Sequence, residues 1–139
     1  MARVTPTPDR PLPVPTPETA HFWEGTAHGE VRLQRCRACS ETYFPPQPSC
    51  PACDADDVEV VRASGHGTLH SYVITDRAAP GFEAPYVIAV VELDEGPRLL
   101  TNLVGVAPDP DVLPLDLPVE VVYEAVGDVT LPWFRPRRA

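Results

Sequence analysis

Cysteine occurs four times in the chain, at positions whose spacing is typical of a metal site. The residues Cys36, Cys39, Cys50 and Cys53 follow the pattern C-x2-C-x10-C-x2-C. Each C-x2-C pair fits a tight turn that presents two thiolates to one ion, and the residues between the pairs allow a hairpin to bring both turns together. Four thiolates in tetrahedral geometry favour structural Zn²⁺, with iron as the alternative, and leave no open coordination position. The sequence therefore predicts a metal site that stabilises the fold and performs no catalysis.

Two other uses of paired cysteines fit the sequence less well. Disulfide bonds are typical of secreted proteins, but residues 1–20 are rich in proline and threonine and contain no apolar stretch like that of a signal peptide. A redox C-x2-C motif is expected near a βαβ pattern, which surrounds neither pair. The sequence also lacks a run of about 18 apolar residues that could span a membrane. We therefore expect a cytoplasmic protein without a membrane partner.

No convincing set of catalytic residues emerges from the sequence. Every cysteine belongs to the metal set, which excludes a thiol nucleophile. His66 and His70 are close to Ser71, but strand alternation puts the two histidines on one face and the serine on the other. A serine nucleophile also requires an orienting acid and an oxyanion hole, and nothing in the sequence positions either. We therefore assign no catalytic residue to this chain.

The charge of the chain argues against a nucleic-acid partner. The formal net charge is −9, and all eleven basic residues are arginine. Binding to a phosphate backbone draws its affinity from lysine and arginine side chains, which this chain has in deficit. The basic C-terminal segment, with Arg135, Arg137 and Arg138, departs from the acidic average. A solvated terminus is the simpler interpretation of this segment, and contact with a nucleotide phosphate is the alternative.

The segment before the cysteines combines an extended tail with a short helix. Residues 1–17 carry proline at nearly every second position, which forbids a helix and favours an extended tail or linker. Thr16 is a good helix cap and Pro17 suits the first helical position, so we expect the helix to start there. The helix presents Phe22 and Trp23, an aromatic pair that is usually an anchor onto another surface.

The rest of the chain reads as short strands. The ribbon strands are expected at residues 31–35, 43–46 and 58–61, and later strands at 68–74, 86–93, 98–104, 119–124 and 130–134. Five such strands within about 70 residues fit a small closed barrel of the five-stranded OB type, with a small sandwich as the alternative. We therefore predict a mainly β chain in three parts: a Pro-rich tail (1–17), a helical segment with the metal ribbon (18–62) and an OB-fold domain (63–139).

The order of these motifs strongly resembles that of the zinc-ribbon/OB-fold acyl-CoA-associated family, formerly catalogued as a domain of unknown function. The resemblance rests on FWEG, GEVRLQRCRAC, FPP, CPAC and GHGTLHSY, and continues through APYVIAVVEL and GPRLLT. It covers about residues 18–136. Ser40 and Asp54 stand where such ribbons often have glycine, and both residue types tolerate turns. The resemblance implies an N-terminal helical segment, a rubredoxin-like zinc ribbon and an OB-fold barrel.

The resemblance also implies a role beside another enzyme. Members of the family are usually partners of thiolase-like enzymes, in thiolase and synthase assemblies and in aldolases that shorten steroid side chains by retro-aldol cleavage of acyl-CoA thioesters. Some members are fused to a MaoC-like hydratase, which is a second expected partner. The catalytic residues of those assemblies lie mainly on the thiolase-like chain. We therefore expect an accessory subunit of a lyase or thiolase hetero-oligomer, which stabilises its partner and helps to enclose the CoA thioester.

Aromatic residues are the candidates for contact with the partner or with CoA. An apolar groove suits the neutral pantetheine arm, and the phosphates are expected to meet arginines of the partner. The candidates are Phe22, Trp23, Tyr43, Phe44 and Phe82. Two alternatives stay open: a nucleic-acid-binding module, which would place aromatic and basic residues on one barrel face, and an iron-centred electron carrier of rubredoxin type.

Overall fold

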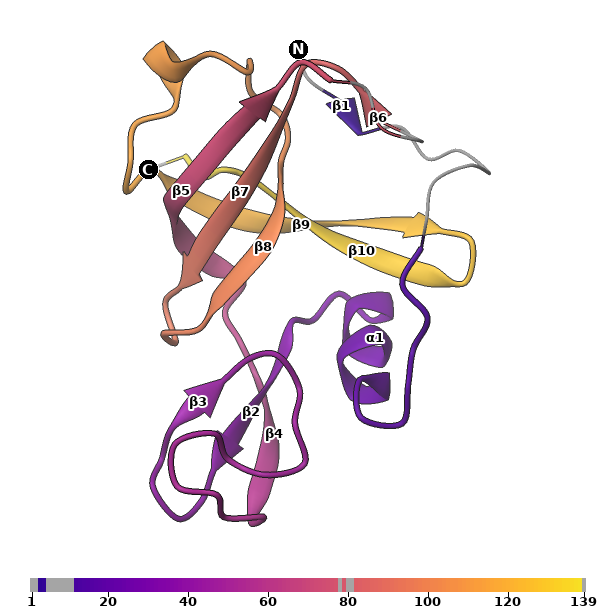
Figure 1. The fold of residues 1–139 in the computed structure, drawn as a ribbon, viewed down its shortest axis with the longest axis vertical. Coiled ribbons are helices and arrows are strands. Elements are labelled where there is room, and N and C mark those ends of the chain that lie inside the picture. The colour runs from indigo at the N-terminus through magenta and orange to yellow at the C-terminus, as the bar shows by residue number, and fades with distance from the viewer. Residues whose placement is uncertain (1–2, 5–11, 78, 80–81, 139) are drawn as a thin grey trace.

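The computed structural model of the chain describes residues 3–4, 12–77, 79 and 82–138. Residues 5–11, which include much of the predicted Pro-rich tail, lie outside the described residues. Figure 1 shows an elongated molecule with a barrel of strands at one end and a small sheet at the other, and helix α1 lies between them. The predicted helix, ribbon and barrel therefore follow one another in the predicted order.

The barrel is built from five strands that close into a ring. These strands are β5 (His66–Thr75), β7 (Tyr86–Leu93), β8 (Arg98–Leu103), β9 (Pro118–Val126) and β10 (Val129–Pro136). Their order is β10-β8-β7-β5-β9, with β9 paired to both β10 and β5. Neighbours are antiparallel except β8 and β10, which run parallel where Phe134 lies opposite Leu103. A closed five-stranded barrel is consistent with an OB-fold, so the barrel prediction is confirmed and the sandwich alternative is wrong.

Alternate residues of the strands fill the barrel interior. In β7, Val87, Ala89 and Val91 are at most 1% exposed, and Phe134 of β10 is completely buried. The residues between them in β7 are only partly buried, because successive side chains point to opposite faces of a strand. Ile88 therefore lies on the outer face of the barrel, where it forms part of the candidate site described below.

Gly67 marks a close approach between β5 and β7. A Cβ atom at this position would clash with the backbone oxygen of Glu92 and lie 2.9 Å from Cγ1 of Val91. The substitution Gly67→Ala is expected to lower the free energy of unfolding by about 2 kcal/mol, because the two strands must move apart. Urea denaturation followed by circular dichroism measures this loss. Ser71→Ala, at an exposed position of the same strand, is the control, and an equal loss in both variants would contradict the steric explanation.

The small sheet contains the cysteine ribbon. Its strands are β2 (Arg32–Cys36), β3 (Thr42–Tyr43) and β4 (Val58–Arg62), in the order β3-β2-β4. They lie where the sequence predicts them, but the return strand ends earlier than expected at Tyr43. Pro45 and Pro46 follow it, and neither has a backbone N–H group to donate to a neighbouring strand.

Helix α1 (Ala20–Ala27) begins later than predicted. Residues 17–19 form a turn, and Thr19 is the residue that precedes the helix. The backbone N–H of Thr19 donates to the carbonyl oxygen of Thr16 over 3.0 Å, which closes this turn. The predicted start at Thr16 and Pro17 is therefore wrong by one turn. Gly29, with a φ of 76°, follows the helix end in the left-handed region that favours glycine.

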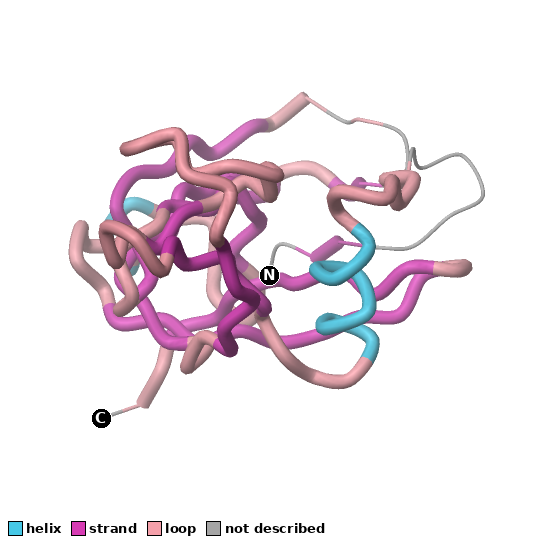
Figure 2. The backbone as a smooth tube through the Cα atoms, turned by 90° about the horizontal axis from the view of Figure 1, so that it is seen from below, coloured by secondary structure: helices cyan, strands magenta, loops and turns pink. Residues whose placement is uncertain are grey.

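The helix, the ribbon and the barrel share one hydrophobic core. Phe22 of α1 and the ribbon residues Val31 and Leu33 belong to the same buried cluster as the barrel residues Leu69 and Val87. Helix α1 contacts both β2 and β10, and Figure 2 shows it alongside the strands. The ribbon is therefore attached to the barrel by packing as well as by the chain that joins β4 to β5.

The other described elements are short. β1 (Arg3–Val4) pairs with β6 (Phe82–Glu83), and the 3-10 helix η1 (Pro110–Val112) lies in the connection between β8 and β9. Leu12 packs against the apolar cluster of the β9–β10 hairpin, so this position of the predicted tail makes a core contact. Within the described part of the chain, no helix has the length and apolar character to cross a membrane.

Candidate metal centre and apolar groove

The four cysteine side chains converge at the end of the ribbon. Their Sγ atoms all lie within 4.8 Å of one another. The Sγ atoms of Cys36 and Cys53 are 3.5 Å apart, and those of Cys39 and Cys50 are 3.6 Å apart. A tetrahedral zinc ion with Zn–S bonds of about 2.3 Å needs sulfur atoms about 3.8 Å apart. The donor set therefore fits a closed tetrahedral zinc site in both chemistry and size.

Two similar turns position the cysteine pairs. Ser40 and Asp54 directly follow the second cysteine of each pair and have positive φ angles of 67° and 64°. The backbone N–H of Ser40 donates to the carbonyl oxygen of Cys36 over 2.8 Å. The backbone N–H of Asp54 donates in the same way to the carbonyl oxygen of Cys50 over 2.8 Å. Serine and aspartate thus occupy the left-handed turn positions that glycine often takes in such ribbons.

Local backbone groups favour the thiolate form that a metal requires. Cys36 and Cys50 are buried, whereas Cys39 and Cys53 lie at the surface. A hydrogen bond from the backbone of Cys39 is the main cause that lowers the pKa of the Cys36 thiol to about 7, against the opposing effect of burial. The N–H of Ala52 lies 3.3 Å from the Sγ atom of Cys50 and donates to it. Hydrogen bonds of this kind stabilise negative sulfur.

An apolar groove of about 580 Å³ lies between α1, the segment after β3 and the outer face of the barrel. Its lining residues are Thr19, Phe22, Trp23, Phe44, Pro45, Pro46, Phe82, Tyr86, Ile88, Leu99, Leu100, Thr101, Asn102, Leu131, Pro132 and Trp133. This volume falls within the range of about 300–1,000 Å³ that is usual for small-molecule pockets. We call this feature the aromatic groove.

Stacked rings fix the walls of the aromatic groove. The Phe22 ring lies 5.0 Å from the Trp23 ring in an edge-to-face arrangement and 5.1 Å from the Phe44 ring. The Phe82 ring stacks on Tyr86 at 4.7 Å. Phe22 is only 4% exposed, so it supports Trp23 and Phe44 from behind. Because such ring pairs are rigid and have few rotamers, the groove is largely preformed.

Three polar side chains of the groove are already paired within the protein. The hydroxyl group of Thr101 donates to the carbonyl oxygen of Pro132, and the side-chain amide of Asn102 donates to Val87, each over 2.9 Å. Trp133 donates its indole N–H to a Glu124 carboxylate oxygen over 2.7 Å. No carboxylate, histidine or arginine is found among the described residues that line the groove. The arrangement can therefore hold an apolar group, and among the described lining residues only the phenol of Tyr86 is of a type that transfers protons.

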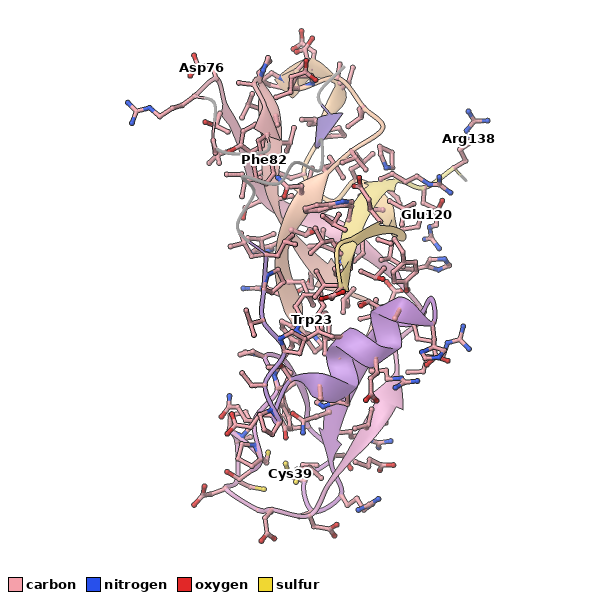
Figure 3. The ribbon with its side chains drawn as sticks, turned by 90° about the vertical axis from the view of Figure 1, so that its right-hand side faces the viewer. Trp23, Cys39, Asp76, Phe82, Glu120 and Arg138 are labelled. Atoms are coloured by element: carbon pink, nitrogen blue, oxygen red, sulfur yellow. The ribbon has the colours of Figure 1, made fainter. Side chains whose placement is uncertain are left out.

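Four of the five predicted contact residues meet in this groove. Phe22 and Trp23 come from α1, Phe44 follows β3, and Phe82 comes from β6. Figure 3 shows Trp23 between the helix and the barrel, with Phe82 further along the barrel and Cys39 at the far end of the ribbon.

Tyr43 is not brought to the groove. It is 5% exposed in a cluster with Cys36 and Cys50, and its hydroxyl group donates to the carbonyl oxygen of Gln47 over 2.9 Å. Burial raises the pKa of the Tyr43 phenol, and the neighbouring Cys50 and Cys36 add to this. Tyr43 ends β3 and Phe44 begins the bend that follows, and their side chains pack in different clusters.

Sequence reasoning missed Leu100, which lies in the groove and is 75% exposed. Its signal was available, because Leu99 and Leu100 are adjacent in one strand and only one of them can face the barrel interior. Leu99, at 3% exposure, takes the inner position. Leu100 therefore faces outward, where it extends the apolar lining of the groove.

Two families match the chain in the order ribbon then barrel. Residues 23–59 match the family described as "ChsH2, rubredoxin-like zinc ribbon domain". Residues 60–124 match the family described as "ChsH2, C-terminal OB-fold domain". The ribbon match covers all four cysteines and, together with the sulfur geometry, supports a structural zinc site.

Related proteins cover most of this chain. A "Probable enoyl-CoA hydratase alpha subunit" of Thermomonospora curvata is 43% identical over 91% of this chain and 40% of its own length. The "3-oxo-4,17-pregnadiene-20-carboxyl-CoA hydratase alpha subunit" of Mycobacterium tuberculosis is 36% identical over 86% of this chain and 38% of its own length. The chain thus spans about two fifths of these two relatives. A solved structure described as "Ltp2-ChsH2(DUF35) aldolase" is 42% identical with a TM-score of 0.81, over 90% of this chain and 98% of that one.

Proposed function

Because the chain belongs to the ChsH2/DUF35 family of zinc-ribbon and OB-fold proteins, we propose that it is the accessory subunit of a thiolase-like enzyme that acts on an acyl-CoA thioester. The reaction is retro-aldol cleavage of a steroid-side-chain type of substrate, with thiolysis or condensation as the alternative. A relative that shares 98% of its length with this chain is described as part of an aldolase with Ltp2, and this supports the first choice.

The aromatic groove is the observation that carries the proposal. It joins side chains of the helix, the ribbon and the barrel into one apolar surface on a scaffold stabilised by zinc. Aromatic residues, tryptophan above all, dominate the binding energy of protein interfaces. Trp23, Phe44 and Leu100 are the exposed or partly exposed contacts that a partner subunit would cover.

The division of labour follows from the side chains present. Retro-aldol cleavage requires a base that removes the proton of a β-hydroxyl group and a group that stabilises the enolate of the thioester. The described lining of the aromatic groove contains no carboxylate, histidine or lysine for the first task. The partner therefore supplies these groups, and this chain stabilises the partner and encloses the acyl-CoA away from water. The names of the two long relatives support a hydratase as a further partner.

The nucleic-acid alternative receives no support from this surface. Binding of single strands needs basic side chains beside the stacking rings. The aromatic residues gathered here have no arginine among the described residues that line the groove with them. An electron carrier is likewise disfavoured, because the matching ribbon family is described as a zinc ribbon.

Affinity capture tests the proposal directly. The tagged chain, purified from its native cells, is expected to carry a thiolase-like chain at matched stoichiometry, identified by mass spectrometry. The isolated partner is then expected to be unstable or inactive, and addition of this chain is expected to restore acyl-CoA cleavage. Full activity of the partner alone would contradict the proposal. Capture of nucleic-acid-handling proteins that salt or nuclease removes would instead revive the alternative.

A further inference from the structure

A second hollow, of about 540 Å³, lies at the C-terminal end of β10. It is lined by Gly105, Glu120, Arg135, Pro136, Arg137 and Arg138. Figure 3 shows Glu120 and Arg138 on the same side of the barrel, away from Cys39 and the ribbon. We call this feature the arginine hollow. It is separate from the aromatic groove, and the proposed function makes no use of it so far.

The backbone that carries the arginines is held in place. Pro136 still pairs with Val119 across the β9–β10 ladder, and the N–H of Arg137 donates to the carbonyl oxygen of Pro118 over 2.9 Å. The backbone at Arg135 and Arg137 is therefore anchored to β9, in contrast to the solvated terminus that is the simpler interpretation of the sequence. Only the side chains of these arginines extend into solvent.

Positive charge remains unbalanced in the arginine hollow. Arg135 pairs with Glu120, with 2.9 Å between Nε and a carboxylate oxygen. Arg137 instead places a guanidinium nitrogen 2.8 Å from Nδ1 of His66, and this contact requires a neutral imidazole as acceptor. The described residues place no carboxylate within ion-pair distance of Arg137 or Arg138. In a chain of formal charge −9, these two guanidinium groups thus have no carboxylate counter-charge among the described residues.

One face of β10 connects the two hollows. Leu131 and Trp133 line the aromatic groove, and Arg135 and Arg137 line the arginine hollow. Leu131, Trp133 and Arg135 alternate within β10, so strand geometry directs them to the same face, and Arg137 follows directly after the strand ends at Pro136. Trp133 and Arg135 are about 7 Å apart along this strand, at about 3.3 Å per residue. The surface along β10 therefore changes from apolar to cationic toward the end of the strand and the two arginines that follow it.

We infer that the arginine hollow binds the phosphate groups at the nucleotide end of the acyl-CoA thioester. The guanidinium fork matches two phosphate oxygens at once and is the side chain best suited to this recognition. An acyl-CoA has an apolar acyl end and a phosphorylated nucleotide end joined by a neutral arm, and the surface along β10 likewise runs from apolar to cationic. The inference rests on the proposed function for the identity of the ligand, and it assigns the phosphates to this chain rather than to arginines of the partner.

Calorimetric titration of the purified chain with CoA and with adenosine 3′,5′-bisphosphate tests the inference. The double substitution Arg137→Gln/Arg138→Gln is expected to weaken binding of both probes at least about tenfold, since charge-assisted hydrogen bonds are lost. Arg77→Gln/Arg98→Gln removes the same charge elsewhere on the barrel and is expected to bind both probes like the unaltered chain. Added salt should weaken the binding of both probes.

Three results would overturn the inference: no binding by the unaltered chain, equal binding after Arg137→Gln/Arg138→Gln, or an equal loss in the control variant. Capture of the thiolase-like partner is measured in parallel to separate this inference from the proposed function. Retained capture with lost phosphate binding supports both. If the unaltered chain binds the bisphosphate through these arginines but captures no such partner, the proposed function fails and the phosphate site stands. Lost capture with unchanged phosphate binding would assign the arginines to an acidic segment of the partner instead.

Discussion

Replacement of Cys50 by serine is expected to release the zinc ion and unfold the ribbon. A serine hydroxyl is a poor substitute for a thiolate, and structural zinc contributes on the order of 10 kcal/mol to the folding of small zinc domains. The end of the ribbon that carries the cysteines has little other structure to hold it, because β3 is only two residues long and the sheet has three strands. Elemental analysis measures the zinc content, and trypsin cleavage after Arg35 and Arg37 reports the loss of ribbon structure.

The shared core extends this effect to the barrel. Val31 and Leu33 are each 1% exposed and pack in the same cluster as barrel residues such as Leu69. We expect the barrel strands to persist after Cys50→Ser but to melt at a lower temperature, because this packing is lost. Ser49→Ala, at the preceding position, is the control and should keep both zinc and stability. A Cys50→Ser protein that still binds one zinc ion and melts normally would contradict a structural metal site.

Features fixed by neighbouring residues were predictable from the sequence. The cysteine spacing specifies the metal site, because each turn forms within a few residues. The alternation of apolar and polar residues locates the strands, because it can be seen within a few consecutive residues. The start of α1 was less certain. Thr16 and Thr19 are equally good capping residues, and only the turn between them, closed by their hydrogen bond, decides that the helix begins at Ala20.

Features that depend on how distant segments pack were not predictable in the same way. Phe22, Phe44 and Leu100 meet only because the barrel closes and the ribbon packs beside it. The sequence did not show that Tyr43 packs beside the cysteines while its neighbour Phe44 lines the groove. The shared core was also missed, since Val31 and Leu33 look like ordinary ribbon residues until the barrel is placed against them.

The substitution Leu100→Asp is expected to prevent capture of the thiolase-like partner without unfolding the chain. Leu100 is 75% exposed on β8, so in the free chain a carboxylate at this position stays in water and costs little. In the complex the same carboxylate would be buried among apolar side chains without a counter-charge. Such an unpaired charge costs about 3 kcal/mol or more, which corresponds to at least about a hundredfold loss of affinity. Surface plasmon resonance with the purified partner measures this loss.

Val73→Asp provides the matched control for this experiment. Val73 is also an apolar strand residue at the barrel surface, 59% exposed on β5, but it does not line the aromatic groove. Both variants add one negative charge and one residue of low strand propensity, so any general effect on the barrel should appear in both melting curves. Only Leu100→Asp should lose the partner, because only that carboxylate would be buried on assembly. Normal capture by Leu100→Asp, or equal losses in the two variants, would show that the partner binds somewhere other than the aromatic groove.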